Sequence, residues 1–435
     1  MGRLLIRGGR AVSPADNLDD ERDGLTRDFL IEDGLIKEIA PQLDVKADTV
    51  LDARGGIVAP GFIDLHVHLR EPGGEASETL ETGVRAAVAG GFTAVCPMPN
   101  TRPVNDSPIL TRSLVEKGKE LGLARILPIA AVSMGSQGEQ LSEFIALKQA
   151  GAVGFSDDGL PIKTAGLLRR AFEYAERLEM PIIEHCEDLS LSAGGVVHEG
   201  TVAARLGLRG ISPAAEDVTV GRDLIVAQQT GGRIHLAHLS TARSIAMVRT
   251  AKARESRRSQ ITCEVTPHHF ILTESALADY DTHAKMNPPL RTEEDIEAVQ
   301  SGLADGTVDA IATDHAPHSD DSKAVEFDRA PFGVIGLETA LALTLTYLVH
   351  PGKITLSRMI ELLSTNPAKV LGRPVGRLAP GSVADLTLFD PERKWTYRAM
   401  AGESKSHNSP FDGWELRGAA TATVVDGKVV YQRRL

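Results

Sequence analysis

Two histidines stand two residues apart at the end of an apolar run, in the stretch GFIDLHVHLREPG from Gly61 to Gly73. Alternate side chains of a β-strand point to the same face. His66 and His68 are therefore expected to share a face, with Arg70 in the same register. Imidazole nitrogens bind metals, and a guanidinium pairs with a carboxylate through two hydrogen bonds. The stretch predicts a metal site beside an anion site.

Further apolar runs end in the same residue types. Asp157 and Asp158 end one run, Asp314 ends another, and His185 and His238 end two more. A single histidine is more often a structural residue than a ligand. Four histidines and two aspartates, with the Asp157–Asp158 pair counted once, at the ends of five runs instead favour a metal centre.

Eight such runs alternate with amphipathic stretches such as residues 164–179 and 294–306. The runs are residues 56–68, 91–100, 125–133, 151–159, 180–188, 233–240, 260–269 and 308–318. This alternation is typical of βα units and a parallel sheet. Eight units predict a (β/α)8 TIM-type barrel, whose active site lies at the C-terminal ends of the strands. Pro128 makes the third run the least regular.

Both ends of the chain differ from the barrel. Residues 1–55 and 374–435 contain short β-rich runs, and the sequences EDG and VDG carry the Asp-Gly signal of a hairpin. We expect a small β-sandwich domain formed by both termini, next to a barrel over residues 56–373. Two unrelated β extensions are the alternative. A single domain is favoured because chain termini usually lie close together.

The ligand types indicate which ions fit. Imidazole and carboxylate without thiolate suit Zn²⁺, Mn²⁺, Co²⁺ or Fe²⁺. Six candidate ligands exceed the need of one tetrahedral ion, so we expect two ions about 3.5–4 Å apart that share a carboxylate and a hydroxide. Such ions bring the pKa of bound water to about 7. The chemistry implied is metal-assisted hydrolysis or its reverse.

Strand parity separates neighbouring candidates. Asp157 and Asp158 should face opposite ways, so only one of them is expected to reach the metals. His235 and His238 cannot share a face either, and His238 lies nearer the strand end, which leaves His235 a supporting or core role. His268 and His269 are expected at most to support the site. The remaining histidines are expected in solvent: His198, His283, His350 and His407.

The composition of the chain indicates which classes of partner are excluded and which cellular compartment is expected. The chain has 47 basic and 59 acidic residues, a net charge of −12, which argues against nucleic acid and anionic membranes as partners. A small anionic substrate remains compatible with a locally basic site. The three cysteines show no CxxC spacing. No apolar run approaches the ~18 residues of a membrane span, and no signal-peptide core is present, so we expect a cytoplasmic protein.

Several motifs resemble those of bacterial class I dihydroorotases, within the cyclic amidohydrolase superfamily, in order and spacing over essentially the whole chain. They are GFIDLHVHLREPG, GGFTAVCPMPNTRPV, GFSDDG, EHCED, CEVTPHH, MNPPLR, ATDHAPH, APFGVIGLET and GSVADLTLFDP. The resemblance implies the reversible cyclisation of N-carbamoyl-L-aspartate to L-dihydroorotate in pyrimidine biosynthesis. It also implies two divalent ions per chain, with Zn²⁺ expected, a homodimer, and association with aspartate transcarbamoylase.

The resemblance also assigns roles by position. His66 and His68 would hold one ion, His185 and His238 the other, and Asp158 would bridge both. Asp314 would bind the first ion and act as general acid and base. The implied substrate contacts are His68, Arg70, Asn100, Asn287, His318 and the backbone of Phe332 and Gly333. The polar residues 319–331 are a candidate lid.

Two departures and two rivals bear on this assignment. Hydantoinases, allantoinases and the animal-type dihydroorotase carry a carboxylated lysine on the fourth strand, whereas GAVGFSDDG contains none. Glu71 stands where the family motif has aspartate, a conservative change. A hydantoinase would also lack the anion site of Arg70. A catalytically dead partner of aspartate transcarbamoylase would lack the metal histidines, all of which are present here.

Overall fold

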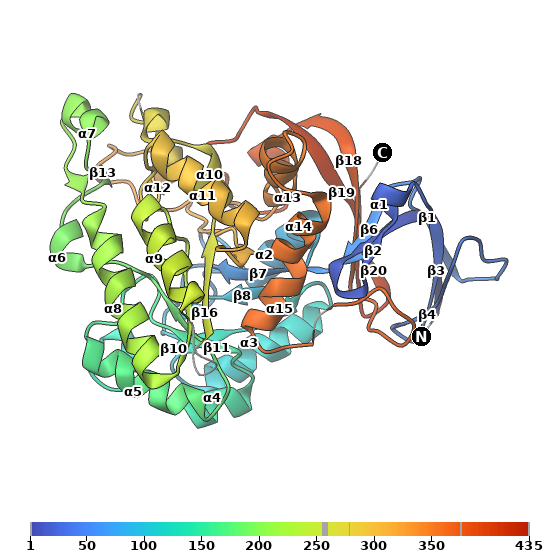
Figure 1. Cartoon of the computed structure of the whole chain (residues 1–435), viewed down its shortest axis with the longest axis horizontal. Helices are drawn as coiled ribbons and strands as arrows, with labels where there is room; N and C mark the ends of the chain where they lie inside the picture. Colours follow the sequence, from blue (N-terminus) through green and yellow to red (C-terminus); the bar gives the residue numbers. More distant parts are fainter. Residues whose placement is uncertain (1, 255–259, 278, 375, 434–435) are drawn as a thin grey trace.

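The computed structural model describes residues 2–254, 260–277, 279–374 and 376–433. All predicted site residues lie in these ranges. The chain folds into an α/β barrel-like body and a β-rich region beside it, on the left and right of Figure 1. Because the barrel carries the chemistry-bearing residues, its strands are described first.

Parallel strands follow each other around the barrel in chain order. Their bounds are β7 Phe62–Val67, β8 Phe92–Pro97, β9 Arg125–Ile126, β10 Ile129–Ala131, β11 Gly154–Ser156, β12 Ile182–Glu184, β15 Arg233–Leu236, β16 Gln260–Val265 and β17 Ala310–Ile311. β9 and β10 are one strand interrupted at Pro128, which lacks the N–H that a ladder requires. A parallel bridge between Val67 and His315 joins the last strand to the first. The predicted barrel core is therefore confirmed.

Helices connect the strands and cover the outside of the barrel (Figure 1). The longer ones are α2 Leu80–Ala89, α3 Pro108–Leu121, α4 Phe144–Ala150, α5 Ala165–Glu176, α8 Ala214–Thr230, α9 Ala242–Ala253 and α11 Glu293–Asp305. After the last strand come α13 Ala340–Thr344, α14 Leu356–Ile360 and α15 Asn366–Val370. The two amphipathic stretches predicted from sequence correspond to α5 and α11. No helix in the described part of the chain is long and apolar enough to cross a membrane.

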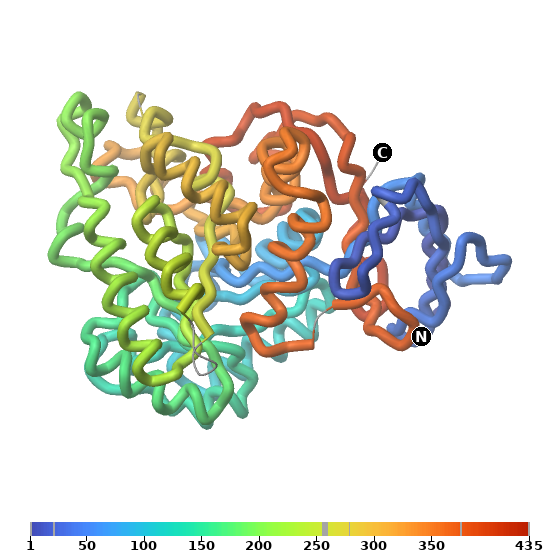
Figure 2. The backbone as a smooth tube through the Cα atoms, in the orientation of Figure 1, coloured from blue at the N-terminus to red at the C-terminus, as the bar shows by residue number. Residues whose placement is uncertain are grey.

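Strands from both ends of the chain form one sheet, in the order β20-β19-β18-β6-β1-β3-β4. Their bounds are β1 Arg3–Ser13, β3 Arg27–Glu32, β4 Leu35–Ala40, β6 Ile57–Pro60, β18 Leu386–Thr396, β19 Glu415–Val425 and β20 Lys428–Gln432, with β5 Thr49–Asp52 beside β1. Figure 2 shows the N-terminal and C-terminal segments side by side at the right. Both Asp-Gly turns are hairpins, because β3 pairs with β4 and β19 with β20. That this sheet forms a sandwich stays a prediction.

The expected strand over residues 56–68 is two strands, and this expectation was wrong. β6 pairs with β18 in the terminal sheet, whereas β7 pairs with β8 in the barrel. The break falls at Gly61, where an added Cβ would collide with the side chain of Thr93. The close approach of the Thr93 side chain therefore requires glycine at the point where the chain passes from the sheet into the barrel.

The terminal sheet packs against the outside of the barrel. Phe62 of β7 contacts both Phe92 of β8 and Phe389 of β18, with ring centroids 6.2 and 6.1 Å apart. Thr387 of β18 accepts a hydrogen bond from the Phe62 N–H and donates one to the Gly91 carbonyl. These contacts fix the start of β7, the strand that leads to His66 and His68.

Candidate metal centre

Three of the four predicted histidine ligands are oriented by an oxygen acceptor at one ring nitrogen. Nδ1 of His66 lies 3.0 Å from Glu264 Oε1, Nδ1 of His68 lies 2.9 Å from Asn100 Oδ1, and Nε2 of His185 lies 2.8 Å from Glu187 Oε2. The acceptor holds the proton on that nitrogen. The other nitrogen is then left with its lone pair, as metal-ligating histidines require.

The Asp158 carboxylate lies between two pairs of histidines. Its Oδ2 is 3.4 Å from His66 Nε2 and 3.7 Å from His68 Nε2. Its Oδ1 is 3.4 Å from His185 Nδ1 and 3.5 Å from His238 Nε2. Each oxygen thus faces one pair, which is the arrangement of a carboxylate shared by two ions.

Asp314 lies on the side of the first pair. Its Oδ1 is 3.0 Å from His68 Nε2 and 3.6 Å from His66 Nε2. Within the described residues, two groups have ligand atoms close enough to hold an ion. They are His66 with His68 and Asp314, and His66 with Asp158 and His238. The six predicted ligands therefore converge.

The donor set fits divalent ions on physical grounds. His66 Nε2 and Asp158 Oδ1 are fully buried and have no hydrogen-bond partner. A buried polar atom without a partner costs free energy, about 1–3 kcal/mol, and a cation at the cluster would remove this cost. Imidazole nitrogen with carboxylate oxygen is the ligand mixture of zinc and related first-row ions.

The two carboxylates of the cluster are ionised despite burial. Burial acts to raise the pKa of Asp158, but His66, His185 and His238 hold it well below its usual value. The pKa of Asp314 is also lowered, because hydrogen bonding from His68 and the charges of nearby histidines outweigh burial. Both groups are therefore acceptors at neutral pH.

The choice within each neighbouring pair agrees with the structure, although Asp158 and His238 lie just beyond the ends of β11, Gly154–Ser156, and β15, Arg233–Leu236, and not on the strands. Asp157 turns away from the cluster and accepts hydrogen bonds from the N–H and hydroxyl of Ser133. His235 lies behind the cluster, with Nε2 3.0 Å from Glu264 Oε2. Asp158 and His238 are thus the members of each pair that face the centre.

The burial of the remaining histidines differs in part from the prediction. His198 is buried, and its Nδ1 lies 3.1 Å from Arg291 Nη1, so the expectation that it lies in solvent was wrong. Its burial follows from β13 Val197–His198, a strand too short to detect by periodicity. His268 and His269 are both buried; His269 bonds Thr266 and the Pro288 carbonyl, while His268 Nε2 has no partner.

The predicted anion-binding residues form one wall of the site. Arg70 Nε donates to the Pro317 carbonyl, and its Nη2 lies 3.4 Å from His318 Nε2. His318 Nε2 is 2.7 Å from the Phe332 carbonyl, so it is this nitrogen that carries the proton. Burial lowers the pKa of Arg70 to about 10, which leaves the guanidinium charged.

The prediction that Arg70 continues the strand register of His66 and His68 was wrong. β7 ends at Val67, and Arg70 has a left-handed backbone with φ 60°. Arg70 therefore does not continue the strand register of His66 and His68. It reaches the site through a turn beyond the strand, where it meets the segment that follows Asp314.

Asn287 and Gly333 lie near the same centre. Asn287 Nδ2 donates to Glu187 Oε2, the atom that also accepts from His185. The Gly333 N–H donates to the Lys285 carbonyl. Gly333 has φ +138°, and an added Cβ would lie 2.7 Å from the Ala316 oxygen, so this approach requires glycine.

The candidate lid, residues 319–331, contains the short helix α12 Asp320–Lys323. Lys323 is buried, and its ammonium donates to the carbonyls of Thr282, Lys285 and Pro331. The segment is thus fixed to residues 282–285 in this structure. Its role as a lid stays a prediction.

Sequence reasoning missed the residues that support the ligands. Glu264 is the last residue but one of β16, and Asp64 stands two residues before His66 and accepts from its N–H. Parity within each strand would have placed both side chains inside the barrel. Glu187 was quoted in the EHCED motif, but no periodic signal marks it, because it lies beyond the end of β12.

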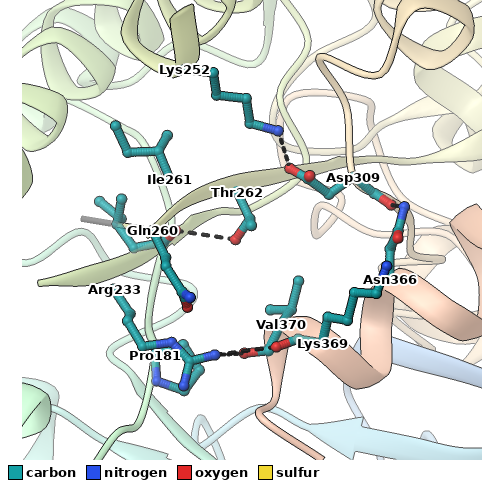
Figure 3. Close-up of a pocket in the computed structure, with 11 residues that line it drawn as sticks. Pro181, Arg233, Lys252, Gln260, Ile261, Thr262, Asp309, Asn366, Lys369 and Val370 are labelled. Atoms are coloured by element: carbon teal, nitrogen blue, oxygen red, sulfur yellow. Dashed lines mark hydrogen bonds and ion pairs between the residues drawn. The ribbon is translucent and has the colours of Figure 1, made fainter. Parts of the chain in front are cut away.

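A cavity lies at the opposite end of the barrel from this cluster (Figure 3). Two of its cationic side chains, Lys252 and Arg233, bind groups of the protein itself. The Lys252 ammonium donates to Asp309, and the Arg233 guanidinium donates to the carbonyls of Lys369 and Val370. Barrel enzymes carry their chemistry at the other face, so the metal cluster is the candidate site.

Comparison with known proteins places the chain among cyclic amide hydrolases. Residues 55–244 match the model of Dihydro-orotase-like proteins, and residues 228–431 match that of the Amidohydrolase family. A dihydroorotase from Solibacter usitatus is 51% identical over 99% of this chain and 98% of the relative. The chain belongs to the dihydroorotase family. A second relative, from Pelotomaculum thermopropionicum, is 50% identical over the whole chain and 99% of its own length.

Solved structures extend this family's likeness to other cyclic amidohydrolases. L-hydantoinase from Arthrobacter aurescens is 26% identical and superimposes with a TM-score of 0.86, over 99% of this chain and 96% of that one. A dihydropyrimidinase from Brevibacillus agri, 22% identical with a TM-score of 0.82 over 99% and 95%, shares the fold. The dihydroorotase family and the hydantoinases thus share one architecture, and the site must distinguish their chemistry.

Proposed function

We propose that this chain is a dihydroorotase that interconverts N-carbamoyl-L-aspartate and L-dihydroorotate through a pair of divalent ions. The Asp158 carboxylate, with one oxygen facing each histidine pair, is the observation that carries the proposal. A lysine is not needed as a bridge because Asp158 occupies that place. Family membership at about 50% identity supports the same substrate.

His66, His68 and Asp314 would hold one ion and His185 and His238 the other, with Asp158 between them. Bound ions would supply Lewis-acid polarisation of the ring carbonyl and a water of lowered pKa. Glu264, Asn100 and Glu187 keep His66, His68 and His185 in the tautomers that ligation requires. Zn²⁺ is the ion we favour for this donor set.

Asp314 is the general acid and base in this proposal. It is ionised and nearly buried at the ends of the barrel strands. It therefore accepts the proton released when the ring amide is attacked, and donates it to the leaving nitrogen. In the cyclisation direction the same carboxylate takes the proton from the carbamoyl nitrogen.

Arg70 and His318 form the site for the substrate carboxylate, with Asn100 beside them. The guanidinium is charged, whereas the pKa of His318 is lowered to about 3 by burial and by the charges of Arg70 and Lys323. His318 is therefore a neutral partner. Asn287 and the backbone of Phe332 and Gly333 would contact the ring.

Hydantoinase activity is the second candidate, because the structural neighbours carry that name. A hydantoin ring carries no carboxylate in the position that Arg70 would bind. The charged, half-buried Arg70 favours dihydroorotate. An assay on both substrates tests this choice: turnover of dihydroorotate alone supports the proposal, and turnover of hydantoin alone refutes it.

The proposal also covers the oligomeric state, the partner, the location and the domain boundaries of the chain. We infer a homodimer, association with aspartate transcarbamoylase and a cytoplasmic location from the family resemblance. We propose residues 1–55 and 374–435 for the terminal domain and 56–373 for the barrel, except that β6, Ile57–Pro60, belongs to the terminal sheet. Light scattering of the purified chain, alone and with aspartate transcarbamoylase, tests the assembly.

A further inference from the structure

A residue from the C-terminal part of the chain lies against the predicted substrate wall. Asn408 is 1% exposed and lies between η7, Ala399–Ala401, and β19, far in sequence from the barrel strands. Its Oδ1 accepts from the His318 N–H at 3.0 Å. Its Nδ2 donates to the carbonyls of Ala316 and Gly333, each at 3.0 Å. One amide thus joins two segments that carry predicted substrate contacts.

Every polar atom of this amide is used. A primary amide offers two N–H donors and a carbonyl acceptor, and Asn408 makes a bond with each. The backbone carbonyl of Asn408 also accepts a hydrogen bond from the Ile335 N–H at 3.0 Å. Asn408 is therefore bound both to Gly333 and to Ile335, two residues further along the chain. No polar atom of its side chain is left to contact substrate.

The segment that carries Asn408 is itself fixed to the barrel. The Ser404 hydroxyl donates to Glu78, and the Lys405 N–H donates to the same carboxylate at 3.1 Å. The Ser406 hydroxyl donates to the Ser77 carbonyl at 2.6 Å. Glu78 also contacts Nε2 of His315, which is next to Asp314 in the chain. Asn408 is thus presented from a rigid support.

We propose that Asn408 is a positioning residue that sets the spacing between His318 and the Phe332–Gly333 backbone, and so the binding of the substrate carboxylate and ring. This rests on the proposed function. It acts through His318 and Gly333, because its own amide is fully engaged. A displacement of about 1 Å at such groups can cost 10²-fold in rate or affinity.

The test compares Asn408→Ala and Asn408→Ser with Asn366→Ala. Asn366 donates its amide to the Asp309 carbonyl at the far end of the barrel (Figure 3), and so controls for the loss of an asparagine amide outside the site. Steady-state kinetics with dihydroorotate and carbamoyl aspartate, metal content and melting temperature are measured for each variant.

Asn408→Ala is expected to raise KM for both substrates about tenfold or more, with kcat changed less than about fivefold and metal content unchanged. Asn408→Ser retains one hydrogen-bond donor, so its KM should lie between the KM values of Asn408→Ala and wild type. Asn366→Ala should leave KM unchanged. An unchanged KM in folded Asn408→Ala overturns the proposal. The proposal is also overturned if activity falls only in proportion to the metal content or the folded fraction. Failure of both Asn408 variants to fold overturns it too.

Failure of the two proposals can be told apart. A wild-type chain that does not turn over dihydroorotate refutes the proposed function, and the Asn408 inference with it. A fully active wild-type chain whose Asn408 variants keep the wild-type KM refutes only the role of Asn408.

Discussion

Glu264→Gln should weaken metal binding without removing any ligand. Glu264 is fully buried, and its two oxygens each lie 3.0 Å from a histidine nitrogen, one on His66 and one on His235. Burial acts to raise the pKa of Glu264, but the bonds from His235 and His66 lower it to about 2, so both oxygens accept. Glutamine keeps one acceptor and places an N–H₂ group against the other ring.

The size of the effect follows from that mismatch. If the amide nitrogen faces His66, the proton must leave Nδ1 for Nε2, the nitrogen that faces Asp158. If it faces His235, that buried ring must change its tautomer instead. Loss of such a supporting bond typically weakens metal affinity 10- to 100-fold, which corresponds to about 1.4–2.7 kcal/mol.

Chelator competition with zinc measures this affinity directly. Glu338→Gln is the matched control, because Glu338 is a mostly buried carboxylate that accepts from the Glu403 and Ser404 N–H groups outside the centre. The control should keep wild-type zinc affinity. A Glu264→Gln variant whose zinc affinity stays within twofold of wild type would show that Glu264 does not support the metal ligands.

Three further substitutions test other parts of the account. Asp314→Asn should retain metal but lose about 10²-fold or more in kcat in both directions; cyclisation of carbamoyl aspartate at a near wild-type rate would contradict this. Arg70→Met should raise KM about 10- to 100-fold through loss of a charged hydrogen bond, and unchanged KM and kcat would remove Arg70 from the site. Burial raises the pKa of Glu338 from 4.5 to about 7. The protonated carboxyl therefore stabilises the fold below pH 4.5, and this stabilisation, about 3 kcal/mol, is lost as the pH rises through 7. Glu338→Gln should abolish this pH dependence in chemical denaturation, and a loss of wild-type size in the variant would contradict it.

The ligand positions could be predicted because they depend on local rules. Parallel strands bring their C-terminal ends to one face, so residues at those ends converge. The choice of Asp158 over Asp157 and of His238 over His235 agrees with the structure, although Asp158 and His238 lie just beyond β11 and β15. The order of the strands follows from short right-handed connections. These features need no knowledge of distant contacts.

The supporting residues depend on distant contacts and could not be predicted in this way. Asn408 is 90 residues from His318 and lies in a segment without regular structure. Arg70 reaches the wall through a left-handed turn that strand periodicity does not describe. The break between β6 and β7 depends on the approach of Thr93 to Gly61, which is visible only in three dimensions.

The central claim is that Asp158 lies between two ion sites that act together. It is tested most directly by titrating the metal-free chain with Zn²⁺ while dihydroorotate hydrolysis is followed. Activity is expected to rise to a plateau at about two equivalents of Zn²⁺ per chain. A plateau at one equivalent, or full activity in the metal-free chain, would contradict it.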